Sequence, residues 1–319
     1  MTTQHFLITG GTGFIGKALC HQLVAAGHRI TVVSRQTVIP GGRNPAALPA
    51  QAHCVRRPDQ IPEDEHVDVV INLAGEPLDS SRWNEASKAE FCLSRLRATQ
   101  ALIDWMRSCK QPPHTFISAS AIGWYGHQGS KTLTETSEAS PGFSHQLCDR
   151  WEHCAMQARS LGVRVCILRI GIVLERDGGS LARMLLPFRL GLGGPLGDGQ
   201  QMMSWIHRED LLQLIQFLAN NPDQQGVFNG TAPQPVNNEQ FSRSLAKQLG
   251  RPAWLRLPAP LLRVIFGQMA DELLLKGQRV LPVAATAAGF AFSYPKLDDA
   301  FEAILSRPKA QTVASPTSG

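Results

Sequence analysis

The chain lacks the features that identify several classes of protein from sequence. Nowhere in its 319 residues does an uncharged apolar stretch approach about eighteen residues, and the N-terminus has no basic segment followed by a long apolar run. Its formal charge of +5 comes from basic residues that stand singly or in pairs, without a stripe suited to nucleic acid. We therefore expect a cytoplasmic protein that binds neither membrane nor nucleic acid.

Paired cysteines are also missing. The seven cysteines are odd in number, form no Cys-x-x-Cys pair and mostly lie in segments with apolar periodicity. Reduced, buried thiols explain this pattern better than a metal or redox site does, so we expect no bound metal. Tyrosine is scarce as well, since Tyr125 and Tyr294 are the two that the chain contains. The 43% of hydrophobic residues can fill the core of one large domain or two modest ones.

A glycine-rich turn separates a strand-like run, residues 5–9, from a segment with apolar residues at helical spacing. Gly10 permits a tight turn, Gly13 lets the backbone approach a pyrophosphate, and Gly16 lets the helix pack closely on the sheet. The helix N-terminus offers free N–H groups and the positive end of a dipole to phosphates. A turn without a ligand is the alternative. We predict a dinucleotide-binding turn made by Gly10, Gly11, Thr12, Gly13, Phe14, Ile15 and Gly16.

The end of the second expected strand, residues 29–34, indicates which dinucleotide binds. A unit that prefers NAD places an acidic residue here to accept the ribose hydroxyls, whereas this strand ends in Ser34 and Arg35. An arginine pairs with the 2′-phosphate that a carboxylate would repel. We therefore predict NADP(H) in preference to NAD(H). The alternative is that Arg35 merely caps a strand in solvent.

Three further segments are expected at the same edge of the sheet. The apolar strand at 67–73 ends in the small residues of 72–75, the strand that resumes at 115 runs into two serines, and Arg169 lies near the end of the strand at 163–170. Strands and helices alternate throughout this half, which predicts an α/β fold with a Rossmann-type doubly wound parallel sheet. Additional candidate cofactor contacts are Leu73, Ala74, Gly75, Ser118 and Arg169.

The strict alternation ends after residue 179, and this indicates a second structural unit. We expect an NADP(H)-binding Rossmann domain at 1–175, with part of 203–230 as a candidate to return to it. Residues 176–305 would form mainly a smaller C-terminal substrate domain, and 306–319 a disordered tail. Within the second unit we predict a helix at 271–281, in which Arg279 is either an anion contact or a solvated helix end.

Together these motifs resemble the extended or atypical short-chain dehydrogenases/reductases. More narrowly, the chain is similar to an epimerase-like family of NAD(P)-dependent nucleotide-sugar epimerases, some of whose bacterial members are labelled cell-division inhibitors. The resemblance covers residues 4–305 and implies NAD(P)(H), a cleft between two lobes, and a small-molecule substrate such as a nucleotide sugar, in a monomer or homodimer. The segments that carry it are 9–16, 72–75, 118–120, 169–174, 187–197, 205–211 and 277–282.

The resemblance also implies a Ser-Tyr-Lys set, in which tyrosine transfers a proton, lysine lowers its pKa and serine orients the substrate. Ser120 matches the serine, but Ser144 and Cys148 stand where tyrosine and lysine belong. Tyr125 is a candidate substitute acid, and His145 with Asp149 would form an acid–base pair on one helix face. Structural roles are the alternative for both.

The sequence therefore favours an NADP(H)-dependent oxidoreductase or epimerase that acts on a carbinol or carbonyl through a non-standard site. The alternative is a cofactor-binding regulatory protein, related to cell division, that has no turnover. Both readings share the same fold and the same cofactor, so the reaction itself is what separates them.

Overall fold

The computed structural model describes residues 3–35 and 47–306, and its centre is a seven-stranded sheet. The strands of this sheet are β1 (His5–Thr9), β2 (Arg29–Val33), β3 (His53–Val55), β4 (Val69–Asn72), β5 (Thr115–Ala121), β7 (Arg164–Ile170) and β11 (Gly226–Gly230). They lie in the order β11-β7-β5-β4-β1-β2-β3, and every neighbouring pair is parallel. The strand order changes direction between β1 and β4, so the predicted doubly wound sheet is confirmed.

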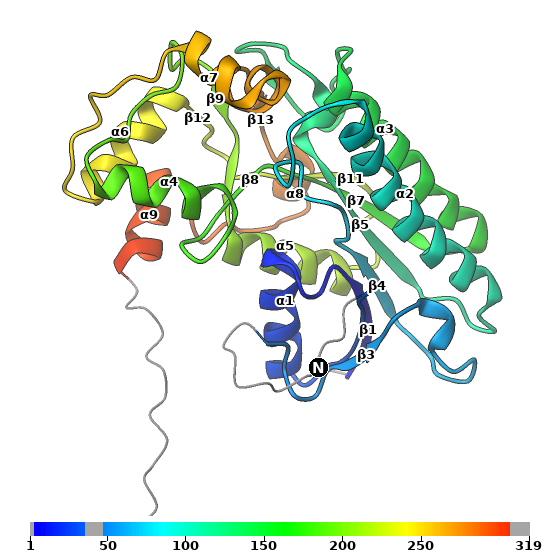
Figure 1. The fold of residues 1–319 in the computed structure, drawn as a ribbon. Helices are drawn as coiled ribbons and strands as arrows, with labels where there is room; N and C mark the ends of the chain where they lie inside the picture. The colour runs from blue at the N-terminus through cyan, green and yellow to red at the C-terminus, as the bar shows by residue number, and fades with distance from the viewer. Residues whose placement is uncertain (1–2, 36–46, 307–319) are drawn as a thin grey trace, which may run out of the picture.

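Helices cover both faces of this sheet (Figure 1). The α-helices of the described residues are α1 (Phe14–Ala25), α2 (Glu85–Ser108), α3 (Phe143–Met156), α4 (Gly179–Arg189), α5 (Arg208–Asn220), α6 (Asn238–Gln248), α7 (Ala259–Phe266), α8 (Val283–Ala287) and α9 (Leu297–Ser306). Phe6 and Ile8 of β1 are buried with apolar residues of α1 and α5, whereas Leu7 is buried with residues of α2 and α3. A continuous apolar strand is thus explained by burial on both faces.

A third core lies beside the sheet, where α4, α6 and α9 pack together (Figure 1). Trp205, Phe241 and Phe301 are fully buried there. Short strand pairs join this region to the rest of the chain: β8 (Ile172–Leu174) with β10 (Trp205–His207), β9 (Met202–Met203) with β12 (Val236–Asn237), and β6 (Thr132–Leu133) with β13 (Arg279–Val280). Because β11 is an edge strand of the main sheet, residues on both sides of the expected boundary near 175 build one sheet.

The predicted helix at 271–281 is wrong. The chain forms a π-helical turn at Ala270–Leu274 and then the short strand β13, in which Arg279 pairs with Thr132 and is exposed. Hydrogen bonding to β6 outweighs the local helical pattern, as tertiary context does for short segments. At the other end, Ser306 closes α9 instead of starting a disordered tail, and 307–319 lie outside the described residues.

Two observations concern the features that the sequence lacks, a long apolar run and paired cysteines. Within residues 3–35 and 47–306, no helix combines the length and the apolar character that a membrane span needs. All seven cysteines are free, and each is buried or half-buried.

The close packing at Gly16 gives a prediction about stability. A methyl group at this position would lie 2.2 Å from the carbonyl oxygen of Gly10, although alanine is otherwise the better helix former. We expect Gly16→Ala to lower the free energy of unfolding by about 1–3 kcal/mol, because the backbone must move. Urea unfolding measures this, with Lys17→Ala on the same turn as the control. A variant as stable as the parent would contradict the close packing.

Candidate functional site

The carboxyl ends of the central strands meet at the glycine turn between β1 and α1. Gly10 has a φ of +69°, a conformation that side chains disfavour. A Cβ at Gly10 would also lie 2.6 Å from the carbonyl oxygen of Leu73, in the loop that follows β4. The turn, the first turn of α1 and this loop are therefore packed as closely as their backbones allow.

The first turn of α1 has no side-chain cap. Its N-cap residue is Gly13, whereas side chains cap the N-termini of α2, α5 and α6. Thr12 and Gly13 are exposed, and Gly11 and Gly16 are buried. The first N–H groups of a helix have no acceptor within it, and they lie at the positive end of its dipole. This end of α1 can therefore accept a phosphate without displacing a protein group.

Phe14 and Ile15 are half-buried at the start of α1. The ring of Phe14 lies against Gly178 and Gly179, since a Cβ at Gly178 would lie 2.3 Å from its Cδ2 atom. The guanidinium of Arg208 lies 5.0 Å from the centre of the same ring. The segment that follows β8 is thus packed against the glycine turn, which brings the second half of the chain to this edge.

Arg35 is exposed directly after β2. The backbone N–H of Ser34 donates to the carbonyl of Val55 at the end of β3, which holds the strand end in the sheet. Residues 36–46 lie outside the described residues. The role of Ser34 and Arg35 in choosing the cofactor stays a prediction.

Asn72 joins the ends of three strands. Its Oδ1 atom accepts a hydrogen bond of 2.7 Å from Thr9, and its Nδ2 atom donates to Thr99 at 2.9 Å and to Ser118 at 3.3 Å. Asn72 and Ser118 are fully buried. The Ser118 hydroxyl therefore belongs to the floor of the crevice, while the backbone of Ala74 and the exposed Gly75 lie at its edge.

A buried carboxylate holds Ser120. Glu152 of α3 accepts a hydrogen bond of 2.6 Å from the Ser120 hydroxyl, and it also accepts two from Arg169, at 2.9 and 2.8 Å. Ser120 and Arg169 are paired in the register of β5 and β7, so both side chains reach the same face of the sheet. Glu152 is 8% exposed and Arg169 3% exposed, so the bidentate ion pair is shielded from water.

Arg169 remains charged in this environment. Burial by itself lowers the pKa of Arg169, but the hydrogen bonds and the charge of Glu152 outweigh burial and hold that pKa above its usual value. The guanidinium lies 3.4 Å from the centre of the Trp124 ring. Within the described part of the chain, its Nη1 atom is buried and has no hydrogen-bond partner.

The two candidate substitute acids are both engaged by the protein. Tyr125 is fully buried and donates its hydroxyl to Oδ1 of Asn229 at 2.7 Å. Burial raises the pKa of Tyr125, so its phenol is neutral. The Nδ1 atom of His145 lies 2.6 Å from the Trp124 carbonyl, and Asp149 lies 3.7 Å from His153 on the next turn. Tyr125 and His145 are therefore each held by a contact with another part of the protein.

Ser144 and Cys148 differ in their surroundings. Ser144 donates to Oε2 of Glu272 at 3.0 Å. Burial raises the pKa of Cys148 to about 11, so at neutral pH it is a thiol without charge. Ser144, Cys148 and Glu152 recur every four residues, which places them on one face of α3. We call these three residues the α3 stripe.

Sequence reasoning missed two residues beside the α3 stripe. Glu272 lies in the π-helical turn of the C-terminal region, and its Oε2 atom is 3.4 Å from Nε2 of His127. Glu272 is 128 residues from Ser144 along the chain, and no periodicity connects them. In the sequence, these two residues stand out only by their polarity. Glu272 is an acid in a short helical turn with apolar neighbours, and His127 directly follows Gly126, a glycine with positive φ.

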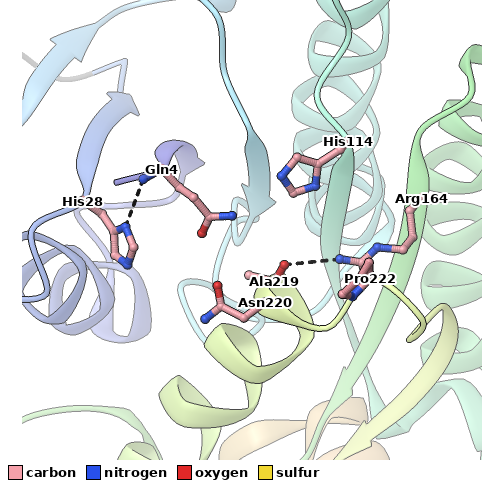
Figure 2. A pocket seen from close by; sticks show the side chains of 7 residues that line it. All are labelled: Gln4, His28, His114, Arg164, Ala219, Asn220 and Pro222. Atoms are coloured by element: carbon pink, nitrogen blue, oxygen red, sulfur yellow. Dashed lines mark hydrogen bonds between the residues drawn. The ribbon is translucent and has the colours of Figure 1, made fainter. Parts of the chain in front are cut away.

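A cavity in the described residues lies away from this site. Its volume is about 630 Å³, and it is lined by Gln4, His28, His114, Arg164, Ala219, Asn220 and Pro222 (Figure 2). His114 and Arg164 are at the amino ends of β5 and β7, so the cavity lies at the opposite edge of the sheet from the glycine turn. The Arg164 guanidinium already donates to several protein acceptors, Ala219 among them. Open α/β sheets bind ligands at the carboxyl edge, which favours the crevice as the site.

Within residues 3–35 and 47–306, no three His, Cys, Asp or Glu residues come together in a group that could hold a metal ion.

Comparison with known families places most of the chain in two regions. Residues 6–229 match the NAD dependent epimerase/dehydratase family, and residues 257–304 match a domain of unknown function (DUF1731). The first match spans the glycine turn, Ser120, Glu152 and Arg169, and the second spans Glu272.

Individual proteins are similar over nearly the whole chain. The Arabidopsis thaliana protein called epimerase family protein SDR39U1 homolog, chloroplastic, is 38% identical over 309 residues, which cover 93% of this chain and 86% of that protein. The crystal structure of human epimerase family protein SDR39U1 (isoform 2) with NADPH is similar with a TM-score of 0.85 and 34% identity, over 96% of this chain and all of that one. A nucleoside-diphosphate sugar epimerase from Corynebacterium glutamicum has a TM-score of 0.75 and 29% identity, over 95% of this chain and 58% of that one.

The ion pair between Glu152 and Arg169 gives a second prediction. Glu152→Gln would leave the Arg169 guanidinium buried without a counter-charge, so we expect the free energy of unfolding to fall by about 3–5 kcal/mol. Asp104→Asn, which removes an exposed partner of Arg107, is the control and should change it by less than about 1 kcal/mol. Denaturant unfolding of both variants measures the difference. Equal effects would show that burial does not matter to the pair.

Proposed function

Because the chain belongs to the NAD dependent epimerase/dehydratase family, we propose that it is an NADP(H)-dependent oxidoreductase or epimerase that acts on a carbinol or carbonyl group. The resemblance drawn from its motifs is thereby confirmed at the level of the family. The observation that carries the proposal is that an uncapped glycine turn and Ser120, held by a buried carboxylate, lie at the same edge of the sheet.

The cofactor fits the residues at the start of α1. The free N–H groups of Phe14, Ile15 and Gly16 would receive the pyrophosphate, and the backbone of 73–75 would line the neighbouring edge. Arg35, exposed after β2, would pair with the 2′-phosphate. When bound, NADP(H) supplies or takes up a hydride. The NADPH in the human structure agrees with the predicted preference for NADP(H) over NAD(H).

Ser120 would orient the substrate. Its hydroxyl proton is committed to Glu152, so the oxygen keeps its lone pairs for a hydrogen bond from a substrate hydroxyl. Glu152 acts through Ser120 and Arg169 and is a positioning residue. The unpartnered Nη1 atom of Arg169 is a donor that an oxygen of the ligand would satisfy.

The substrate that we favour is a nucleotide sugar, bound mainly by residues 176–305 as a substrate domain. The similarity to the Corynebacterium glutamicum nucleoside-diphosphate sugar epimerase supports this choice. The cytoplasmic location and the monomeric or homodimeric state remain predictions.

A regulatory protein that binds NADP(H) without turnover is the second candidate. One specific observation favours it: the positions of the usual tyrosine and lysine hold Ser144 and Cys148, and the Cys148 thiol has a pKa of about 11. In this case the crevice would bind the cofactor, and no residue on the α3 stripe would transfer a proton.

A substrate screen separates the two candidates. Purified protein with NADPH or NADP⁺ is tested against UDP-sugars and small carbonyl compounds. We expect turnover, and we expect Ser120→Ala to lower kcat/KM by about tenfold or more, equivalent to a lost hydrogen bond of about 1.4 kcal/mol. Tyr125→Phe is included as well. A normal rate in this variant would mean that Tyr125 takes no part in the reaction and that its hydroxyl only bonds to Asn229. Tight NADPH binding without any turnover would favour the regulator.

The charge of Arg35 gives a third test of this function. We expect Arg35→Asp to weaken NADPH binding and to move the preference toward NADH, because the new carboxylate repels the 2′-phosphate and can accept the ribose hydroxyls. Titration calorimetry with both cofactors measures the preference. Arg29→Asp, at the other end of β2, makes the same charge change and should leave it unaltered. An unchanged preference in Arg35→Asp would remove Arg35 from the phosphate site.

A further inference from the structure

Glu272 connects the C-terminal region to the start of α3. It lies in the turn Ala270–Leu274, directly after Met269, which packs against the apolar cluster around Ala119 and Trp151. The same cluster contains Leu73 and Ile170, at the carboxyl ends of β4 and β7. The turn that carries Glu272 is therefore seated against the wall of the crevice.

The α3 stripe leads from Ser120 to Glu272. Glu152 accepts from Ser120 at one end of the stripe, and Ser144 donates to Glu272 at the other. The backbones of Ser144 and Glu152 are about 12 Å apart along the helix axis. A Cβ at Gly123, in the 3₁₀ turn after β5, would lie 3.1 Å from Cβ of Ser144 and 3.9 Å from the Cys148 sulfur. The stripe thus runs along the segment that leaves β5, and Glu272 stands at its outer end.

The two oxygens of the Glu272 carboxylate are used differently. Oε2 accepts the Ser144 hydroxyl at 3.0 Å and lies 3.4 Å from Nε2 of His127. No residue in the described part of the chain donates a hydrogen bond to Oε1, and the side chain keeps 14% of its exposure. One oxygen is anchored, and the other is available to a ligand.

A helix N-terminus and a histidine lie beside the Glu272 carboxylate. Ser144 is in the first turn of α3, whose N-cap residue Gly142 has no side chain, and the positive end of the helix dipole stabilises an anion there. His127 is neutral near pH 7, because burial lowers its pKa and the charge of Lys276 adds to this effect, while Glu272 opposes both. Glu272 therefore lies beside a neutral imidazole and not beside an imidazolium.

We propose that Glu272, positioned by Ser144 and lying beside His127, is the proton-transfer residue of this protein, at the place where Ser144 replaces a tyrosine. The inference rests on the proposed function and adds the acid–base group to it. In the oxidation direction the O–H bond of the reacting carbinol, bound at the Ser144 end of the stripe, breaks and its proton bonds to Oε1 of Glu272, while Ser120 binds another hydroxyl of the same substrate. The electron pair of that O–H bond then forms the C=O bond. The electron pair of the carbinol C–H bond leaves with its hydrogen as the hydride that NADP⁺ would receive. In the reverse direction the protonated carboxyl returns the proton to the same oxygen.

Glu272→Gln tests the proposal with a neighbouring carboxylate as the control. Asp271 precedes Glu272 in the same turn but pairs with Arg263 on α7. With the best substrate from the screen, we expect Glu272→Gln to lower kcat by about 100-fold or more and to change the shape of its pH profile, while the Kd for NADPH stays within about twofold. Glu272→Asp should recover part of the rate, and Asp271→Asn should keep all of it.

A second measurement does not depend on turnover. In the NADPH-loaded protein, the pKa of the His127 imidazole is followed by NMR titration. We expect it to fall in Glu272→Gln, because the carboxylate that raises it is removed, and to stay unchanged in Asp271→Asn. An unchanged His127 titration in Glu272→Gln would overturn the pairing on which the proposal depends.

The outcomes also separate this inference from the proposed function. If the parent protein turns over substrate and Glu272→Gln keeps its rate and pH profile, Glu272 does not transfer the proton, and the proposed function stands. If the parent binds NADPH but turns over nothing, the proposed function fails, and the inference fails with it. A loss of NADPH affinity equal to the loss in kcat would mean that Glu272 only holds the two lobes together.

Discussion

The buried ion pair of Glu152 and Arg169 is the interaction on which the crevice depends. Two charges removed from water are tolerated only when they are well paired and their hydrogen-bonding groups are occupied. Here both carboxylate oxygens accept from Arg169, and one of them also accepts from Ser120. The contact ties α3 to two strands at once. Because these elements are fixed before any ligand arrives, Ser120 is presented in one orientation.

The same contact changes the electrostatics of the site. A lysine at the position of Cys148 would place a free positive charge beside the reacting group, whereas this chain has a neutral thiol there. Arg169 is a buried cation of this wall, and Glu152 already compensates its charge. The charge of Arg95 also acts on Cys148, so a carboxylate from the other lobe meets a positive charge there and not a negative one.

The fold could be predicted from the sequence because its signals are local. A glycine turn between an apolar strand and a periodic helix, repeated strand–helix units and polar residues at strand ends all lie within short windows of the chain. The contacts of the site are not local: whether Ser120 and Arg169 meet Glu152 depends on the register of β5 against β7. Glu272 reaches Ser144 across 128 residues, and Arg279 entered a strand because β6 was there to pair with it. None of these pairings leaves a pattern in a single sequence.

The position of β11 has a consequence for how the protein folds during its synthesis on the ribosome. This strand covers the outer edge of β7, yet more than fifty residues, including α4 and α5, separate the two in the chain. Until residue 230 has been synthesised, β7 presents an unpaired backbone edge, the kind of edge that recruits other strands. Completion of the sheet therefore waits for the second half of the chain. The nascent protein has to be kept from aggregating during that interval, and the two lobes mature together.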